Sequence, residues 1–546
     1  MTDSNYDVII IGSGMGGLFC GTLLAKCGLK ILILEKQVIP GGYLTTFTRK
    51  GYHFDASLHM INGCNEGKST YEMLIEAGVK VSFYKPSDKI PEIALNEVRL
   101  IPVKETCRLI NEDEGLDFII PTDWEEYKSK LIKVFPHEKK NLEGFFKDIE
   151  EVQDLFINFS RSGKLGREEE ISERPELSER FLKGINATAQ DFIDDHGITD
   201  TKLLKILSVL CGFLGVMPDR LSQLMYIAGV YSYNFGGAHQ VIGGSGALVS
   251  ALAECYKNYG GEIKYKSLVD EILIDEESKT ATGIKLLDGT EYTSKYVISN
   301  ADATHTFNDL IKVSEEFKKS NRKFRKMVER LNSRVTSPSA VICYFGLNRD
   351  LREAGITDYE IFHTKGFPTE DELKIYMKNL DFDKFPGFAM TFYSNVDPTC
   401  CPSGKSILAC IYYSDIEPFR KVLDVDGKRG KKYKELKEKI ALGAIRRASK
   451  FLHIPDLEEG IEVMEVATPI TLERYTNNKD GAFIGWSSTP EQTTLHQIPQ
   501  RMPIKNLFLA SAWAMPGGGV SAVMMGGEEA ARRILKIEEI DFKLEK

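Results

Sequence analysis

The sequence lacks the residue patterns on which many enzyme classes depend. It contains no H-E-x-x-H or comparable zinc motif, no G-x-S-x-G nucleophile turn and no Walker loop. Its ten cysteines show no disulfide or zinc spacing, which favours reduced thiols. The net charge of −9 argues against binding to nucleic acid. We therefore expect no metal site and no nucleic-acid partner.

Long uninterrupted hydrophobic runs are also missing. Residues 8–25 and 507–525 carry no charge, but glycines interrupt both stretches, so neither is expected to span a membrane. No cleavable signal is evident, and the sequence predicts a cytoplasmic protein. With 546 residues, 42% of them hydrophobic, the chain is long enough for two or three domains with a large core.

The strongest motif lies near the N-terminus. Residues 8–11 form a β-branched run that is typical of a buried parallel strand, and G-x-G-x-x-G follows at Gly12, Gly14 and Gly17. These glycines permit a tight turn, a close approach of the backbone to a pyrophosphate, and close packing of the next helix. The pattern predicts a dinucleotide-binding βαβ unit, and an ordinary βαβ turn is the alternative interpretation.

An acid and a second glycine pair extend this motif. Glu35 ends the second predicted strand 18 residues after Gly17, close to the ~20 expected for a carboxylate that binds ribose hydroxyls. Gly41 and Gly42 would let the chain pass close to a longer, extended cofactor. We therefore expect FAD rather than NAD, with Lys36 also among its contacts. No second G-x-G-x-x-G is present, so a separate NAD(P)H domain is not expected.

The rest of the chain alternates between strand-like and helix-like segments. The pattern predicts an α/β fold with a Rossmann-like dinucleotide-binding domain. The resemblance of its motifs to those of FAD flavoproteins implies an FAD-binding domain of the glutathione-reductase and amine-oxidase type, interleaved with an α+β substrate domain. The expected parts of the FAD-binding domain are residues 1–115, 241–310 and 491–546. A helical domain facing substrate or membrane is expected at 116–240, and a substrate domain of mixed sheet and helices at 311–490.

Three internal segments need interpretation. Residues 203–235 are apolar on nearly all faces, which fits either buried core helices or the lining of an apolar tunnel or membrane-facing wall. Residues 318–334 carry eight basic residues and one acid, with an apolar stripe at helical spacing. They predict either a solvated face over the core or a helix on an anionic membrane. The glycine cluster at 243–246 is not interpreted as a nucleotide site, because no buried strand is predicted before it.

The C-terminal region contains a second clear motif. A predicted strand at 506–510 is followed by Pro516 and three glycines, and then by a helix through Leu535. A helix N-terminus with unpaired backbone N–H groups stabilises an anionic group. This turn is therefore a candidate partner for the cofactor phosphates.

Together these motifs resemble the phytoene desaturase, carotenoid isomerase and retinol saturase family of FAD flavoproteins. The resemblance rests on the N-terminal glycines, Glu35, the pair Gly41-Gly42 and G-Y-x-F-D at residues 51–55. The segment around His59 is most similar to the saturase branch. Tyr43 departs from the pattern, because many members have arginine after the glycine pair. The specific resemblance covers residues 1–65, 240–310 and 500–535.

The resemblance implies an FAD-dependent oxidoreductase that transfers hydride at flavin N5 and acts on carbon–carbon bonds of a polyene or isoprenoid lipid. Desaturation, saturation and cis–trans isomerisation all stay open. His59 is the candidate proton donor or acceptor, and Tyr43 and Trp513 are candidate substrate contacts. The further implied cofactor contacts are Val269, Asn300, Ala301, Ser511, Gly518, Gly519 and Val520.

Two other functions fit the same architecture. An amine oxidase-like enzyme would need a narrow aromatic cage beside the flavin. A redox-silent lipid-binding module, similar to Rab escort and GDP-dissociation-inhibitor proteins, would have lost the flavin. The sequence identifies no electron donor or acceptor, and peripheral membrane contact is compatible with the lipid substrates of the family.

Overall fold

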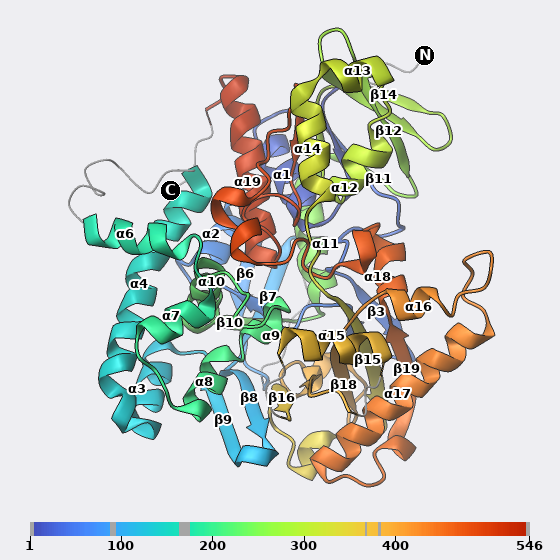
Figure 1. Cartoon of the computed structure of the whole chain (residues 1–546). Coiled ribbons are helices and arrows are strands. Elements are labelled where there is room, and N and C mark those ends of the chain that lie inside the picture. The colour runs from blue at the N-terminus through green and yellow to red at the C-terminus, as the bar shows by residue number, and fades with distance from the viewer. Residues whose placement is uncertain (1–4, 88–93, 163–174, 366–368, 381–383, 542–546) are drawn as a thin grey trace.

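The computed structural model describes residues 5–87, 94–162, 175–365, 369–380 and 384–541 (Figure 1). Its first sheet runs in the order β11-β2-β1-β14-β13-β12, and β20 also pairs with β14. Three distant parts of the chain therefore build one sheet. Its strands are β1 Asn5–Ile11, β2 Ile31–Leu34, β11 Glu262–Lys264, β12 Val269–Asp275, β13 Thr280–Leu286, β14 Glu291–Ser299 and β20 Leu507–Leu509.

The β-branched run in β1 is buried on both faces of this sheet. Val8 and Ile10 pack against the helices α1 (Met15–Lys26), α11 (Ser245–Asn258) and α19 (Val520–Ile537). Ile9 and Ile11 pack into the core on the opposite face. A parallel strand covered on both faces has no need of polar alternation, which explains the continuous hydrophobic sequence. The predicted strand, helix and second strand of the N-terminal unit are confirmed.

The second large sheet has the order β19-β15-β18-β17-β16-β8-β9, and α17 (Lys431–Leu452) packs on one face. Strands at residues 105–121 therefore join strands from residues 339–467. The expected division into domains stays a prediction. The strands are β8 Glu105–Asn111, β9 Leu116–Pro121, β15 Ser339–Leu347, β16 Glu360–Thr364, β17 Gly387–Thr391, β18 Ser406–Ser414 and β19 Ile461–Ala467.

Two small sheets lie near the N-terminal unit. The hairpin of β3 (Thr46–Arg49) and β4 (Tyr52–Asp55) stands alone, and a four-stranded sheet has the order β5-β10-β7-β6. The prediction that no buried strand precedes the 243–246 cluster was wrong, because β10 (Ala238–Val241) is wholly buried. It pairs antiparallel with β5 (Ile61–Asn62) and β7 (Glu97–Pro102), so it forms no second βαβ unit. The remaining strand is β6 (Lys80–Phe83).

A helical region forms the left side of the molecule in Figure 1. The apolar segment near residue 210 is broken into short helices that share one hydrophobic core with their neighbours. Among the described helices, none combines the length and the apolar character needed to cross a bilayer. The helices of this helical region are α3 Trp124–Val134, α4 Lys139–Ser162, α6 Pro175–Gly184, α7 Ala189–Asp195, α8 Thr201–Ser208, α9 Cys211–Leu214 and α10 Gln223–Asn234.

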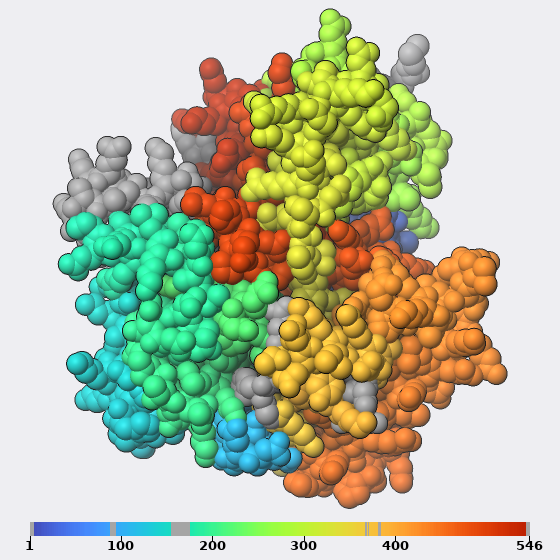
Figure 2. Space-filling model, viewed as in Figure 1, coloured from blue at the N-terminus to red at the C-terminus, as the bar shows by residue number. Residues whose placement is uncertain are grey.

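The basic segment forms two helices rather than one. Asn321 separates α13 (Glu315–Ser320) from α14 (Arg322–Asn332), and its side chain accepts a hydrogen bond from the Phe324 backbone N–H. The stripe residues Phe317, Phe324 and Leu331 are buried in the core, as the core-stripe interpretation requires. Several basic side chains of these helices are exposed, namely Lys319, Arg322, Lys323, Arg325 and Lys326, whereas Arg334 beyond α14 is buried. The two helices contribute to the yellow-green surface at the top of Figure 2.

Candidate active site

A single cavity of about 1230 Å³ brings the predicted site residues together. This volume exceeds the roughly 300–1,000 Å³ of an ordinary ligand pocket, so it has room for a cofactor and a second ligand. Gly17 is the one predicted site residue outside its lining. The predicted residues in the lining are Gly12, Gly14, Glu35, Lys36, Gly41, Gly42, Tyr43, His59, Val269, Asn300, Ala301, Ser511, Trp513, Gly518, Gly519 and Val520.

The glycines form a cradle at one end of the cavity, and side chains at several of these positions would clash with neighbouring protein atoms. A Cβ atom on Gly14 would lie 2.4 Å from Asn300 Oδ1, and one on Gly41 would lie 2.3 Å from the Leu44 carbonyl oxygen. Gly41 also has a φ of +122°, which favours glycine strongly. Gly17 packs against Asn300 and the Gly12 carbonyl, so it serves the close approach of α1 to the sheet. This geometry fits the phosphates of an extended dinucleotide.

Two helix N-termini face the same cavity. Helix α1 begins directly after Gly14, and α19 begins directly after Gly519. The two helices touch, because a Cβ on Gly527 would lie 2.4 Å from the Gly16 carbonyl oxygen. Unpaired backbone N–H groups and the positive ends of two helix dipoles favour a bound pyrophosphate.

Glu35 and Lys36 lie at the end of β2. The Glu35 carboxylate accepts hydrogen bonds from the Ser13 N–H at 2.9 Å, the Ser13 hydroxyl at 2.7 Å and the Gln37 N–H at 2.8 Å. These bonds hold the carboxylate in place, and binding to ribose stays a prediction. Lys36 donates to Asn477 and to the Arg474 carbonyl, and its burial lowers its pKa to about 8. Lys36 thus ties β2 to the end of α18 (Pro469–Thr476).

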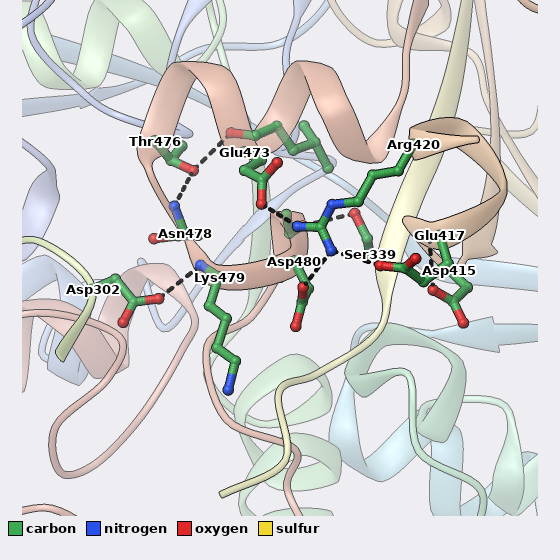
Figure 3. Close-up of polar contacts among 12 residues, drawn as sticks. Asp302, Ser339, Asp415, Glu417, Arg420, Glu473, Thr476, Asn478, Lys479 and Asp480 are labelled. Atoms are coloured by element: carbon green, nitrogen blue, oxygen red, sulfur yellow. Dashed lines mark hydrogen bonds and ion pairs between the residues drawn. The ribbon is translucent and has the colours of Figure 1, made fainter. Parts of the chain in front are cut away.

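The wall formed by residues 475–484 is fixed by a polar network (Figure 3). Asp302, which follows β14, accepts a hydrogen bond of 2.8 Å from the Lys479 backbone N–H. Arg420 bridges Glu473 of α18 at 2.7 Å and Asp480 of the next turn at 3.1 Å. The cofactor sheet and the second sheet are therefore joined along this wall, although the sequence showed no signal for this network.

His59 contacts a buried acid that sequence reasoning missed. Its Nδ1 forms an ion pair with Glu360, which opens β16 and is fully buried. The Thr391 hydroxyl donates to the same carboxylate oxygen at 3.1 Å. Burial alone lowers the pKa of His59, but the Glu360 carboxylate outweighs burial and the pKa is raised above 6.5. The segment that carries His59 is anchored by Asp55, which accepts from the Leu58 N–H at 2.8 Å.

Tyr43 and Trp513 line the cavity, but both direct their polar atoms into the protein. The Tyr43 hydroxyl donates to the Ala482 carbonyl at 2.9 Å, and burial raises the pKa of Tyr43 to about 12. The Trp513 indole N–H donates to Asn478 Oδ1 at 3.2 Å. The Trp513 ring packs edge-on against the Trp486 ring, with 4.7 Å between the ring centroids. Both rings are thus fixed parts of the wall, and their contact with substrate stays a prediction.

Beyond the cradle, the cavity extends between helices α9 and α10 and strands β16, β17 and β18. We call this part the apolar arm. Some of residues 203–235 form the helical core and others line the arm, so the core interpretation and the cavity-lining interpretation each describe part of the segment. A membrane-facing wall stays a prediction. The contribution of the three strands could not be read from the sequence. The residues that define the arm are Val209, Phe213, Leu214, Met225, Ala228, Gly229, Tyr233, Phe362, Phe388, Ile411 and Tyr413.

Comparisons with known proteins agree with this architecture. The chain is 27% identical to the chloroplastic prolycopene isomerase of Arabidopsis thaliana, over 97% of this chain and 83% of that protein. It is 25% identical to the all-trans-retinol 13,14-reductase of Macaca fascicularis, over 97% and 85%. An oxidoreductase structure from Methanosarcina mazei superposes with a TM-score of 0.59 at 16% identity, over 97% and 99%.

A family match covers nearly the whole chain. The family described as flavin containing amine oxidoreductase matches residues 15–535, from the first turn of α1 to the end of α19. The match begins just after Gly14 and includes the first turns of both helices and the glycine pair Gly41-Gly42. The chain therefore belongs to the family of flavin-containing amine oxidoreductases.

Proposed function

We propose that this flavoenzyme acts on carbon–carbon single or double bonds of a polyene or isoprenoid lipid. The observation that carries the proposal is the apolar arm, which continues from the cofactor cradle and is lined by aromatic and aliphatic side chains. The names of the isomerase and reductase relatives point to the same substrate class. Desaturation, saturation and isomerisation of such a lipid all fit this site.

The cofactor is FAD, and the glycine cradle with its two helix N-termini would hold its pyrophosphate. When bound, FAD supplies hydride transfer at N5 of its ring. The protein then has to exclude water, orient the lipid and handle a proton. The arm performs the first two tasks, and His59, at the junction of cradle and arm, is the group we propose for the third.

The two alternative functions have weaker support. An amine substrate would need an acceptor for its ammonium group, but none of the residues that define the arm is acidic, and Glu360 is already paired with His59. The redox-silent module conflicts with membership of an oxidoreductase family. An amine remains the second candidate because the family description names amines.

Filling the apolar arm is expected to stop lipid turnover and to spare the flavin. Gly229 lies on α10 in the arm, and a Cβ there would meet only Leu214 Cδ1, at an ordinary 3.9 Å. Gly229→Phe would place a ring in the arm and should reduce conversion of prolycopene or all-trans-retinol at least tenfold. Its flavin content and bleaching by dithionite should match those of the wild type.

Gly229→Ala is the matched control and should keep its rate within about twofold, because a single methyl group leaves the arm open. Polyene conversion is measured by chromatography, and flavin by visible absorbance. If Gly229→Phe turned over polyenes at the wild-type rate, the arm would not be the substrate site.

We also propose that the basic surface of α14 binds anionic lipid. Lys323, Lys326 and Arg330 of α14 surround a shallow cleft with Arg501. Nearby, Val335 is 65% exposed and the loop of residues 493–497 is tied to α14 through Arg330. Each basic side chain near an anionic bilayer adds about 1 kcal/mol of binding, which falls with salt.

Charge reversal at Lys323 and Lys326 should weaken binding to phosphatidylserine-containing vesicles, measured by sedimentation, by about thirtyfold or more, since the loss of two favourable charges costs about 2 kcal/mol and the new charges are repulsive. Reversal of the exposed pair Lys432 and Lys434 on α17 is the control and should have little effect. Equal binding to neutral phosphatidylcholine vesicles would contradict an electrostatic contact.

A further inference from the structure

Glu360 is a buried acid that the cofactor cradle does not explain. Its side chain has no exposed surface. Oε1 accepts from Thr391 and pairs with His59, whereas Oε2 has no hydrogen-bond partner within the described part of the chain. A buried carboxylate is costly unless it is fully paired. Its presence beside an apolar arm therefore points to a role in the chemistry.

The Glu360–His59 pair lies where the cradle meets the arm. On one side, the Ser57 hydroxyl donates to the Tyr43 carbonyl at 2.9 Å, just after the glycine pair. On the other side, Asn62 lies 3.4 Å from the Ser521 hydroxyl in the first turn of α19. The short segment that carries His59 is thus held between two elements that line the cofactor end of the cavity. A substrate bond held there would lie at the cofactor end of the cavity, where hydride transfer to or from a bound flavin would take place.

We infer that Glu360 is a positioning residue that orients His59 and keeps it protonated, so that Nε2 exchanges a proton with the reacting carbon of the substrate. This inference rests on the proposed function. The Glu360 carboxylate accepts the hydrogen bond of the Nδ1–H group, so Nε2 is the ring nitrogen that is left to exchange a proton with the substrate. Among the described residues, Nε2 has no hydrogen-bond partner, and the His59 side chain, 13% exposed, lines the cavity.

The atoms balance with one proton and one hydride. In the saturating direction the π bond between two carbons breaks and two C–H bonds form. The hydride brings both electrons from flavin reduced in the assay by dithionite, and His59 Nε2 gives the proton. The imidazolium becomes a neutral imidazole that is reprotonated from solvent. In the desaturating direction two C–H bonds break and the π bond forms: the hydride would pass with both electrons to oxidised flavin, and neutral His59 accepts the proton.

The other titratable groups around the pair favour this assignment. Tyr359 donates its hydroxyl to the His59 carbonyl, and Tyr393 donates to the Leu58 carbonyl at 3.0 Å. Burial raises the pKa values of both tyrosines, and also those of Tyr233, Tyr413 and Cys107 near Glu360, so all of them stay neutral. Asp55 adds a weaker attraction that raises the pKa of His59 further. Glu360 is thus the dominant charge acting on His59.

The test is Glu360→Gln in the FAD-loaded full chain. Without the carboxylate, burial should lower the pKa of His59, so the pH midpoint for proton donation should fall by at least one unit. Conversion of all-trans-retinol by dithionite-reduced enzyme should fall at least tenfold at pH 7.5, and should return to within threefold of wild type near pH 5.5. A purely structural defect would lower the rate at every pH.

A second readout does not require turnover. Carbethoxylation of His59 by diethylpyrocarbonate, followed by peptide mass spectrometry, reports the neutral fraction of the ring. Its pH midpoint should lie above 6.5 in the wild type and at least one unit lower in Glu360→Gln. Thr391→Val, which removes one donor but keeps the Glu360 carboxylate, should leave the His59 midpoint above 6.5.

Glu138→Gln is the matched control, because Glu138 is also buried but bonds to Thr199 and Asp200 and lies outside the cavity lining. Unchanged His59 midpoints in Glu360→Gln would overturn the inference. If the wild type converted no polyene, the proposed function would fail, and the labelling midpoints would still decide whether Glu360 controls the charge of His59.

Discussion

A His59→Gln variant is expected to bind FAD normally and to lose 10²- to 10⁴-fold of its rate of polyene conversion, the usual contribution of a general acid or base. Glutamine can keep a hydrogen bond to Glu360 and fills similar space, so the wall of the cavity should survive. Unlike imidazole, its amide cannot exchange a proton near neutral pH. The measurement is the chromatographic rate of all-trans-retinol or prolycopene conversion at matched flavin content.

The control is His53→Gln. His53 lies on the exposed β3–β4 hairpin, where its Nδ1 is 3.0 Å from the Thr48 hydroxyl, and it does not line the cavity. Its substitution should change the rate less than twofold. If His59→Gln kept the wild-type rate across the pH range, His59 would be a structural residue, and the proton would have to come from bound water.

The second large effect is expected at the cradle. Gly41→Ala should purify with less than a tenth of the wild-type flavin, because its Cβ would lie 2.3 Å from the Leu44 backbone oxygen and its φ is +122°. Neither conflict can be relieved by rotating a side chain, so the backbone that lines the cofactor space has to move. The measurement is flavin absorbance relative to protein, before and after reconstitution with FAD.

Gly28→Ala separates backbone strain from loss of the cradle. Gly28 also has a positive φ, of +88°, but a Cβ there would meet nothing within 4 Å, and the residue lies beyond the end of α1 outside the cavity lining. The variant should be destabilised by about 1 kcal/mol and should still carry its flavin. Full flavin occupancy in Gly41→Ala would show that the cradle tolerates a side chain and would refute this account of the glycine pair.

The cofactor half of the site could be predicted because its signals are local. A buried strand, three glycines and an acid within thirty residues specify a turn whose backbone geometry depends on few distant contacts. The C-terminal glycine turn into α19 is likewise specified by residues that are close together in the sequence. For this reason the predicted residues from Gly12 to Gly42 and from Ser511 to Val520 lie around one cavity, with Gly17 behind it.

The substrate half could not be predicted in the same way, because it depends on long-range pairing. His59 and Glu360 are 301 positions apart and meet only when β16 joins the second sheet. Phe362 and Phe388 enter the arm from neighbouring strands whose register no local pattern fixes. The break between α13 and α14 was missed for another reason. Asn321 falls on the apolar stripe between Phe317 and Phe324, where it is buried, and it caps the next helix instead of continuing the first one.

The central claim is that this flavoenzyme acts on a polyene, and the most direct test is an anaerobic reaction of the FAD-loaded wild type. Enzyme with oxidised or dithionite-reduced flavin is mixed with prolycopene, all-trans-retinol or putrescine, and both flavin absorbance and polyene composition are followed. We predict conversion of a polyene and no effect of putrescine. Reduced flavin should be reoxidised if a bond is saturated, oxidised flavin should be bleached if a bond is desaturated, and the flavin should be unchanged if the polyene is isomerised. Bleaching of the oxidised flavin by putrescine, with both polyenes left intact, would contradict the account.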